Sequence, residues 1–252
     1  MTNPFDLTGK VALVTGANTG IGQAIAVALA QAGADIAAAG RTPPDETRAL
    51  VEGLGRRFTA LPADFSSIAP IATLVEETVG TLGRMDILVN NAGIIRRADA
   101  LDFTEADWDA VMDVNIKAVF FLCQAFGRHA IGQGRKGKII NIASMLSFQG
   151  GIRVPSYTAS KSGIAGITKL LANEWAAKGI NVNAIAPGYV ATNNTAALRA
   201  DEKRNAEILG RIPAGRWSTP SDLGGPAVFL ASDASDYVHG TILPVDGGWL
   251  AR

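Results

Sequence analysis

Short apolar runs, bounded by turn residues, alternate with longer stretches of helical periodicity along the whole chain. Such runs are typical of strands that are buried on both faces of a sheet. The predicted strands cover residues 11–14, 35–39, 58–63, 85–90, 138–143, 180–186 and 241–245. Helices are expected over 23–32, 46–53, 68–82, 105–131, 155–178 and 222–232, with Gly33 ending the first and Thr104 capping the fourth.

Strict alternation of strands and helices implies parallel strands that are joined by right-handed helical crossovers. We therefore predict an α/β fold with one doubly wound sheet of about seven parallel strands. The sequence contains no internal repeat, low-complexity tract or linker, so residues 1–252 are expected to form a single domain. The polar, irregular segment 191–216 is interpreted as a helical lid over a site.

Composition narrows the class of partner. Hydrophobic residues make up 48% of the 252 residues, which is enough for a sizeable core. The 23 basic and 23 acidic residues balance, so neither nucleic acid nor a membrane surface is an expected partner.

The single cysteine, Cys123, excludes an internal disulfide and is expected to be an inert core thiol. With no signal-peptide pattern and no apolar run near the roughly 20 residues that span a bilayer, a cytoplasmic protein is expected. We single out no metal site.

The sequence TGANTGIG lies between the first predicted strand and the first helix. Glycines let the backbone turn sharply and approach a ligand, and a helix N-terminus offers free N–H groups to a pyrophosphate. A glycine-rich turn without a ligand is the alternative, which the position in the first βαβ unit disfavours. The loop residues predicted to bind a dinucleotide are Gly16, Asn18, Thr19, Gly20, Ile21 and Gly22.

Further candidates for dinucleotide binding follow the next strands. Gly40 stands where NAD-binding proteins usually carry an acid, and the adjacent Arg41 favours NADP unless it is only a solvated turn residue. Asp64 and Phe65 end the third strand, where Asp64 would accept a hydrogen bond from adenine. The small residues after the fourth strand leave room for a cofactor: Asn91, Ala92 and Gly93. All these positions share the carboxyl edge of the predicted sheet, where open parallel sheets bind ligands.

The stretch 141–161 carries the candidate catalytic residues. Tyr157 and Lys161 are four residues apart in a predicted helix, so their side chains share one face, and Ser144 lies upstream. An isolated Y-x-x-x-K is common, and its meaning depends on the rest of the chain. A free tyrosine, with a pKa of about 10, is a poor base, but a nearby ammonium and a nicotinamide charge would lower that pKa.

With TGANTGIG, NNAG, Asn115, Ser144, YTASK and PGYVAT in order, the chain resembles the short-chain dehydrogenase/reductase family over essentially its full length. The resemblance implies a Rossmann-type fold and a homotetramer. It implies that Tyr157 transfers a proton, that Ser144 holds the substrate oxygen, and that Lys161 binds the nicotinamide ribose. It also implies that Asn115 anchors a water. The segment expected to contact the nicotinamide contains Pro187, Gly188, Val190 and Thr192.

Several stretches are similar to bacterial 2-keto-3-deoxy-D-gluconate dehydrogenases, among them NNAGIIRR, IINIASMLSFQGGIRVPSYTASKSG, RIPAGRW and VDGGWLAR. This resemblance implies reversible oxidation of a hydroxyl group on a small sugar acid, either 2-keto-3-deoxy-D-gluconate or 2-deoxy-D-gluconate. It favours NAD as the cofactor, whereas Arg41 favours NADP, so both stay open. One alternative is a short-chain reductase of another carbonyl compound, a 3-oxoacyl-carrier-protein or a polyol. The other, a dinucleotide sensor without chemistry, is disfavoured because Tyr157 and Lys161 are both present.

A sugar acid requires a cation for its carboxylate and polar groups for its hydroxyls. Arginine binds carboxylate with two parallel hydrogen bonds, and Arg96, Arg97 and Arg153 lie close to the predicted motifs. The alternative for each arginine is a surface or subunit contact. The candidates for hydroxyl groups are Gln149, Asn193 and Asn194. Trp217 and Trp249 are expected to pack without touching the substrate.

Overall fold

Seven strands form one parallel sheet in the computed structural model, which describes residues 3–252. The order across the sheet is β3-β2-β1-β4-β5-β6-β7. The strands are β1 (Val11–Thr15), β2 (Asp35–Gly40), β3 (Phe58–Pro62), β4 (Ile87–Asn90), β5 (Gly137–Ile142), β6 (Ile180–Pro187) and β7 (Ile242–Val245). The predicted doubly wound sheet is confirmed.

The strand order changes direction between β1 and β4. The chain runs outward from β1 through β2 to β3, then returns to β4 beside β1 and continues outward to β7. Connections therefore leave the carboxyl ends of β1 and β4 in opposite directions, which opens a crevice between them. The glycine loop follows β1 and the NNAG stretch follows β4, so both border this crevice.

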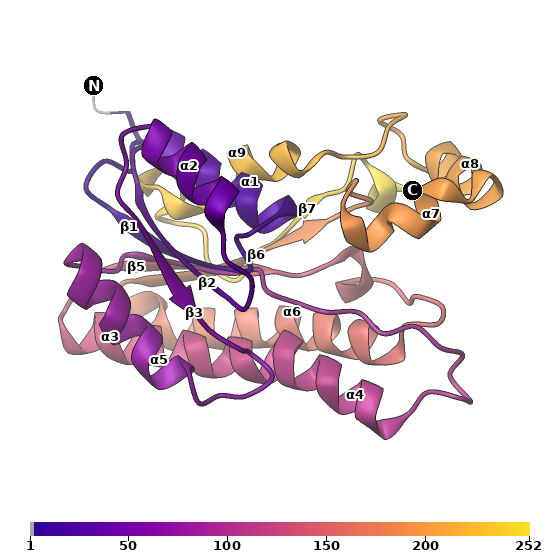
Figure 1. Cartoon of the computed structure of the whole chain (residues 1–252), viewed down its shortest axis with the longest axis horizontal. Coiled ribbons are helices and arrows are strands. Elements are labelled where there is room, and N and C mark those ends of the chain that lie inside the picture. The colour runs from indigo at the N-terminus through magenta and orange to yellow at the C-terminus, as the bar shows by residue number, and fades with distance from the viewer. Residues whose placement is uncertain (1–2) are drawn as a thin grey trace.

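Helices cover both faces of the sheet (Figure 1). On one face lie α1 (Gly20–Gln31), α2 (Asp45–Gly53) and α9 (Gly224–Ala231), with α1 packed against the other two. The other face carries α3 (Ile71–Leu82), α4 (Glu105–Met112), α5 (Ala118–Gly132) and α6 (Pro155–Trp175). The third predicted helix starts three residues later than expected, directly after Pro70, since a proline is tolerated at a helix start.

Alternate residues of each central strand enter different cores. In β1, Val11 and Leu13 belong to the cluster under α3, α5 and α6, while Ala12 and Val14 belong to the cluster under α1 and α9. Every β1 residue is buried because helices cover both faces. This explains why the strand sequences are continuous apolar runs. Cys123, a free thiol, is buried in the first of these cores.

The predicted helix over 105–131 is continuous but contains a π-helical turn. Thr104 caps α4, and its Oγ1 accepts a hydrogen bond from Asp107 N at 3.2 Å. The π turn η1 (Asp113–Lys117) then connects α4 to α5 and carries Asn115. By length and composition this stretch could cross a bilayer. Its apolar side chains nevertheless pack in the core beneath the sheet, which is the arrangement of a core helix.

The lid, defined here as residues 191–216, is largely helical. It contains the short turn η4 (Asn193–Thr195), α7 (Ala196–Ala200) and α8 (Glu202–Arg211). Figure 1 shows α7 and α8 projecting beyond the carboxyl ends of the strands, near the C-terminus. A small apolar cluster joins α8 to the C-terminal residues: Met145, Ile208, Ile212 and Trp249.

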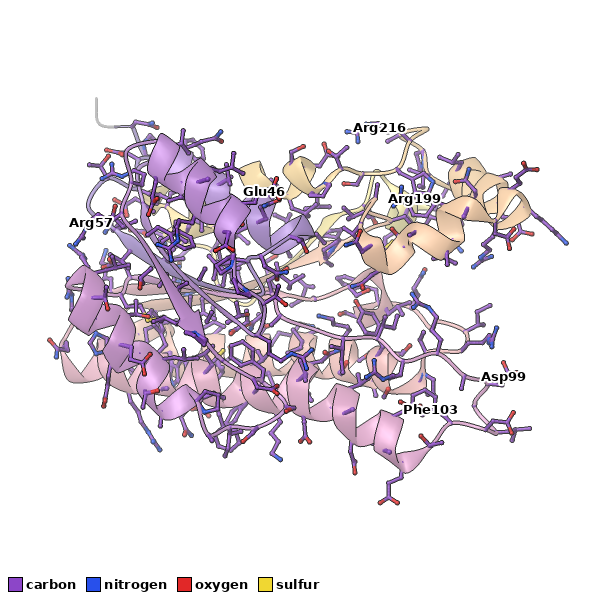
Figure 2. All side chains as sticks on the ribbon, viewed as in Figure 1. Glu46, Arg57, Asp99, Phe103, Arg199 and Arg216 are labelled. Carbon is purple, nitrogen blue, oxygen red and sulfur yellow. The ribbon has the colours of Figure 1, made fainter. Side chains whose placement is uncertain are left out.

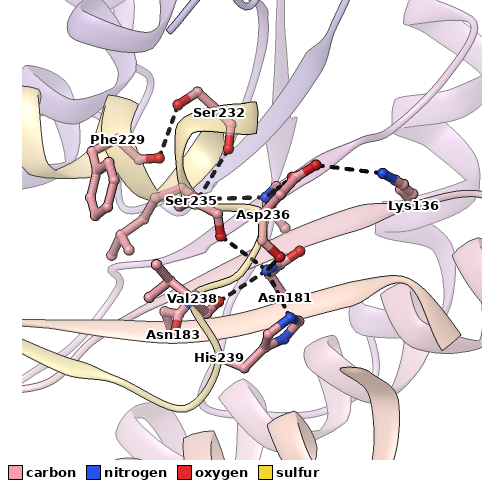
Figure 3. A network of polar contacts seen from close by, with 11 residues as sticks. Lys136, Asn181, Asn183, Phe229, Ser232, Ser235, Asp236, Val238 and His239 are labelled. Atoms are coloured by element: carbon pink, nitrogen blue, oxygen red, sulfur yellow. Dashed lines mark hydrogen bonds and ion pairs between the residues drawn. The ribbon is translucent and has the colours of Figure 1, made fainter. Parts of the chain in front are cut away.

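The opposite end of β6 holds the connection between α9 and β7 (Figure 3). Asn181 Nδ2 lies within 3.2 Å of the carbonyl oxygens of Ser235, Asp236 and Val238. Lys138 Nζ, on β5, donates to Asp236 Oδ1 at 2.7 Å. Two buried side chains of the sheet therefore bind carbonyl and carboxylate oxygens of this loop, which fixes the path of the chain into β7.

Candidate active site

A cavity of about 720 Å³ lies at the carboxyl ends of the strands. Its volume falls within the roughly 300–1,000 Å³ that is usual for ligand and cofactor sites. It extends from Arg41, after β2, to Tyr157 on α6. The predicted site residues that line it are Gly16, Asn18, Thr19, Gly20, Ile21, Gly22, Arg41, Asp64, Phe65, Asn91, Ala92, Gly93, Tyr157, Lys161, Thr192, Asn193 and Asn194.

The glycine loop requires glycine for two different reasons. Gly16 and Gly20 have φ values of +64° and +60°, a backbone region that side chains disfavour. Gly22 instead has no room for a side chain, because an added Cβ would lie 2.2 Å from Gly16 O and 2.4 Å from Asn91 Nδ2. The loop is thus folded tightly onto the start of α1, with the helix N-terminus facing the cavity.

Asn91 holds the glycine loop in place. Its Nδ2 donates to Thr15 O at 2.9 Å and to Gly16 O at 3.0 Å. Thr15 Oγ1 in turn accepts hydrogen bonds from the backbone N–H groups of Asn91 and Ala92. The ends of β1 and β4 are therefore locked together, so the two walls of the crevice keep a fixed separation.

Charges of both signs lie at the β2 end of the cavity. Arg41 is close enough to Asp64 to lower the pKa of that carboxyl, although hydrogen bonds from Ser66 lower it more. Glu46, at the start of α2, lines the same wall (Figure 2). The first turn of α2 is tied to the glycine loop by Thr47, whose Oγ1 donates to Ala17 O at 2.6 Å.

The catalytic candidates meet at the other end of the cavity. Lys161 is 5% exposed, and its Nζ donates to Ile142 O, the last carbonyl of β5, at 2.6 Å. The same nitrogen lies 5.6 Å from the centroid of the Tyr157 ring. Burial lowers the pKa of Lys161 to about 8, because charge is costly away from water.

The surroundings of Tyr157 act on the pKa of its phenol in opposite directions. Burial raises its pKa, while the Ser144 hydroxyl and the positive charge of Arg97 lower it. Ser144 is buried at the start of the turn η2 (Met145–Ser147), and its Oγ accepts from Leu146 N at 3.1 Å. The structure therefore brings Ser144, Tyr157 and Lys161 together, as the sequence predicts.

Asn115 reaches the site from the π turn. Its Oδ1 accepts from Ile94 N at 2.8 Å, and its Nδ2 donates to Ile94 O at 2.9 Å. The side chain thus binds the backbone just after the NNAG stretch and stabilises that wall of the cavity. A π turn also alters the helical hydrogen-bond pattern, which is frequent at functional sites.

Several predicted site residues do not line the cavity itself, although Ser144 and Asn115 lie next to residues that do. Within residues 3–252, the cavity lining does not include Pro187, Gly188, Val190, Ser144, Asn115, Arg96, Arg97, Gln149 or Arg153. Gly188, just after β6, packs closely against the backbone of Asp246, since an added Cβ would lie 2.6 Å from Asp246 Cα. Val190 is buried and bridges to Ser218.

The three candidate arginines have different partners. Arg96 pairs with Asp107 at 3.1 Å, and Arg153 pairs with Asp99 at 3.1 Å. Figure 2 shows Asp99 at the outer tip of the loop after β4. Arg97 instead donates from Nη2 to Asn194 O at 3.1 Å, beside the cavity, and acts electrostatically on Tyr157. Of the three, Arg97 alone is among the groups that shift the pKa of Tyr157.

Sequence reasoning missed several residues of the lining, including Gln23, Thr42, Glu46, Ile94, Val114, Ile142 and Pro220. Only Glu46 carried a usable signal, because it lies in the first turn of α2, directly after the turn that follows β2, where a cofactor ribose is expected. The role of Ile142 rests on a backbone carbonyl, which any residue type would supply. Among residues 3–252, no group of three His, Cys, Asp or Glu side chains is placed to hold a metal ion.

The residues present fit a dinucleotide. A helix N-terminus and a glycine loop without room for a side chain would hold the pyrophosphate. The polar wall near Arg41 and Asp64 would hold the adenosine end, and Lys161 would reach the ribose at the other end. The tyrosine lies beside that second end, where a redox-active ring would meet a substrate.

Comparisons with known proteins match this chain to dehydrogenases and reductases. A protein family described as enoyl-(acyl carrier protein) reductase matches residues 16–250. The chain is 66% identical to the 2-dehydro-3-deoxy-D-gluconate 5-dehydrogenase of Escherichia coli K12, over 98% of each chain. It is 59% identical to the protein of the same name from Bacillus subtilis 168, over 98% of this chain and 97% of that one. A solved structure from Agrobacterium tumefaciens with bound NADP is 63% identical, with both chains covered to 100% and a TM-score of 0.95.

The contacts of Gly22 generate a prediction about dinucleotide binding. The change Gly22→Ala forces the backbone at Gly16 to move, because the new methyl group would overlap Gly16 O. We expect the dissociation constant for NAD or NADP to rise at least about fivefold, since one displaced hydrogen bond or clash is worth about 1 kcal/mol or more. Isothermal titration calorimetry measures this constant. Gly80→Ala is the control, because its Cβ would meet nothing within 4 Å, and equal binding by both variants would contradict the prediction.

Proposed function

Because this chain belongs to the short-chain dehydrogenase/reductase family, we propose that it transfers a hydride between a nicotinamide dinucleotide and carbon 5 of 2-keto-3-deoxy-D-gluconate. This sugar acid is also called 2-dehydro-3-deoxy-D-gluconate, and the relatives from E. coli and B. subtilis are named for it. One observation carries the proposal. Tyr157 and Lys161 line the same cavity as the glycine loop, so a proton-transfer group lies where a dinucleotide would end.

In the proposed reaction the bound dinucleotide supplies or accepts the hydride. Tyr157 gives its proton to the carbonyl oxygen during reduction and takes it back during oxidation. Its raised pKa keeps the phenol protonated in the free protein, which suits it to act as the acid. Ser144 holds the same substrate oxygen and stabilises the phenolate that remains.

Lys161 has two tasks in this scheme. With a pKa of about 8, its ammonium form predominates at neutral pH and favours the Tyr157 phenolate during oxidation. Its remaining N–H groups are available to the ribose hydroxyls of the dinucleotide, since Ile142 O accepts only one of the three. The Ile142 carbonyl thereby orients the ammonium without neutralising it.

We assign the carboxylate of the sugar acid to Arg97. Arg96 and Arg153 each pair with an aspartate, whereas the Nη2 contact of Arg97 is to a backbone carbonyl of the lid. A carboxylate placed on Arg97 would gain a charge-assisted hydrogen bond and would hold the hydroxyl chain against Tyr157. Asn193 and Asn194 line the same region and would serve the hydroxyl groups.

Both dinucleotides are expected to bind. Arg41 favours the 2′-phosphate of NADP, and the related structure from A. tumefaciens contains NADP. Glu46 and Asp64 add negative charge to the same end of the cavity and oppose that phosphate. Charges of both signs thus border the same end of the cavity, which is why both dinucleotides are expected to bind.

We further propose a homotetramer that acts in the cytoplasm. Half-buried apolar side chains on the outer helices, Phe120 and Phe121 of α5, support association, as does the exposed Leu170 of α6. The family resemblance implies the number of subunits. A single buried thiol and a cofactor drawn from the cellular dinucleotide pool fit a reducing compartment.

An oxidation assay tests the proposed function. Purified protein is incubated with 2-keto-3-deoxy-D-gluconate and either NAD⁺ or NADP⁺, and dinucleotide reduction is followed by absorbance. We expect turnover in the wild type and a loss of about 10²–10⁴-fold in Tyr157→Phe, because proton transfer contributes about that much. Dinucleotide affinity should be nearly unchanged in this variant. Retained turnover would remove Tyr157 from its role, and faster turnover of a polyol or a 3-oxoacyl thioester would favour the alternative substrates.

The carboxylate assignment is tested with two neighbouring arginines. We expect Arg97→Met to raise the KM for the sugar acid at least about tenfold, because a charge-assisted hydrogen bond is worth roughly 1.5–3 kcal/mol. The KM for the uncharged amide of the same acid should change little. Arg96→Met is the matched control, since Arg96 pairs with Asp107. Equal losses on acid and amide, or equal effects of both variants, would contradict the assignment.

A further inference from the structure

One side chain, Gln149, joins the loop after Ser144 to the lid and to the C-terminal turn. Its Oε1 accepts a hydrogen bond from Trp249 Nε1 at 3.3 Å and a longer one from Arg211 Nη2 at 3.5 Å. Arg211 is the last residue of α8, and Trp249 is the first residue of the turn η7 (Trp249–Ala251). Three segments that are distant in the sequence therefore meet at one carbonyl oxygen.

Trp249 is fixed by its surroundings. It is 5% exposed, the Arg211 guanidinium lies 4.0 Å from its ring centroid, and the Tyr189 ring lies 4.8 Å away. A buried indole N–H requires an acceptor, and Gln149 supplies it. The direction of this hydrogen bond is unambiguous, because the indole nitrogen can only donate.

Met145 provides a second attachment between the same segments. It is 6% exposed and packs in the apolar cluster with Ile208, Ile212 and Trp249. Met145 directly follows Ser144, and Gln149 follows four residues later. The loop that carries the catalytic serine is thus attached to the lid by an apolar contact and by a hydrogen bond.

The opposite side of this loop is attached to α6. Ser147 Oγ donates to Lys161 O at 2.6 Å, and Ser162 Oγ donates to Leu146 O at 3.2 Å. The loop therefore lies between the helix that carries Tyr157 and the lid. Since the lid contributes Thr192, Asn193 and Asn194 to the cavity, the loop determines how far that wall stands from the tyrosine.

We propose that Gln149 is a positioning residue: by accepting from Trp249 and Arg211 it holds the lid at the distance from Tyr157 that sugar-acid binding requires. This inference rests on the proposed function for its kinetic readout. It differs from the expectation that Gln149 binds a substrate hydroxyl. Gln149 Oε1 already accepts hydrogen bonds from Trp249 and Arg211, so both of its lone pairs are engaged with the C-terminal turn and the lid.

Two substitutions separate the two roles of Gln149. Gln149→Glu keeps the acceptor and removes the donor, so it preserves the bonds to Trp249 and Arg211. Gln149→Leu introduces a side chain of similar shape and removes both the acceptor and the donor. Trp249→Phe keeps an aromatic ring and removes only the indole N–H. If Gln149 is a positioning residue, the Gln149→Glu variant should bind the sugar acid as the wild type does. If Gln149 donates a hydrogen bond to the substrate, Gln149→Glu should be as impaired as Gln149→Leu.

The experiment measures kinetics and lid mobility in the full-length protein. For Gln149→Leu we expect the KM for the sugar acid to rise about fivefold or more, the effect of one lost hydrogen bond, with dinucleotide affinity unchanged. Tryptic cleavage of the lid, at Arg199 and Lys203, should become faster. Trp249→Phe should shift both readouts in the same direction, and Gln149→Glu should stay near the wild type.

Three results would overturn the inference. Equal impairment of the Glu and Leu variants would assign Gln149 to the substrate, and unchanged kinetics and cleavage in Gln149→Leu would leave it without a role. Faster cleavage with an unchanged KM would show that lid position does not govern substrate binding. Cleavage is measured without substrate, so failure of the proposed function would appear separately, as a wild type that turns over no sugar acid.

Discussion

The hydrogen bond between the Lys161 ammonium and the Ile142 carbonyl is the contact on which the active site depends. A charged group taken out of water requires a partner, and the last carbonyl of β5 provides one at 2.6 Å. That carbonyl lies at the carboxyl edge of the sheet because all seven strands run parallel. The sheet therefore fixes the lysine, and the helix fixes the tyrosine four residues before it.

The same edge also fixes the cofactor end of the site. Asn91 locks the end of β4 to the loop after β1, so the crevice where the strand order reverses has a constant width. Catalysis is thus assigned to rigid elements, namely strand ends and α6. Substrate selection is assigned to two loops and the lid, where Arg97 and Gln149 lie. This division explains how one fold can serve many substrates with a constant proton-transfer group.

Much of this arrangement could be predicted from the sequence. Alternating apolar runs and helical periodicity predicted the parallel sheet, and the glycine loop and the Tyr157–Lys161 spacing predicted two groups of residues that line the cavity. The hydrogen bond from Lys161 to the Ile142 carbonyl could not be predicted, because every residue type carries a backbone carbonyl. The choice among Arg96, Arg97 and Arg153 also required the structure, since only the structure shows that Arg96 and Arg153 are each paired with an aspartate.

The central claim is that burial and neighbouring charges control the proton of Tyr157. Titration by NMR with ¹³C-labelled tyrosine tests this most directly, since the chain has three tyrosines and Tyr157→Phe identifies the signal. We predict that the pKa of Tyr157 lies above its ordinary value in the free protein, because burial raises it. Binding of the oxidised dinucleotide should lower that pKa, since its ring carries positive charge. A Tyr157 that titrates at the ordinary value and does not respond to the dinucleotide would contradict the account.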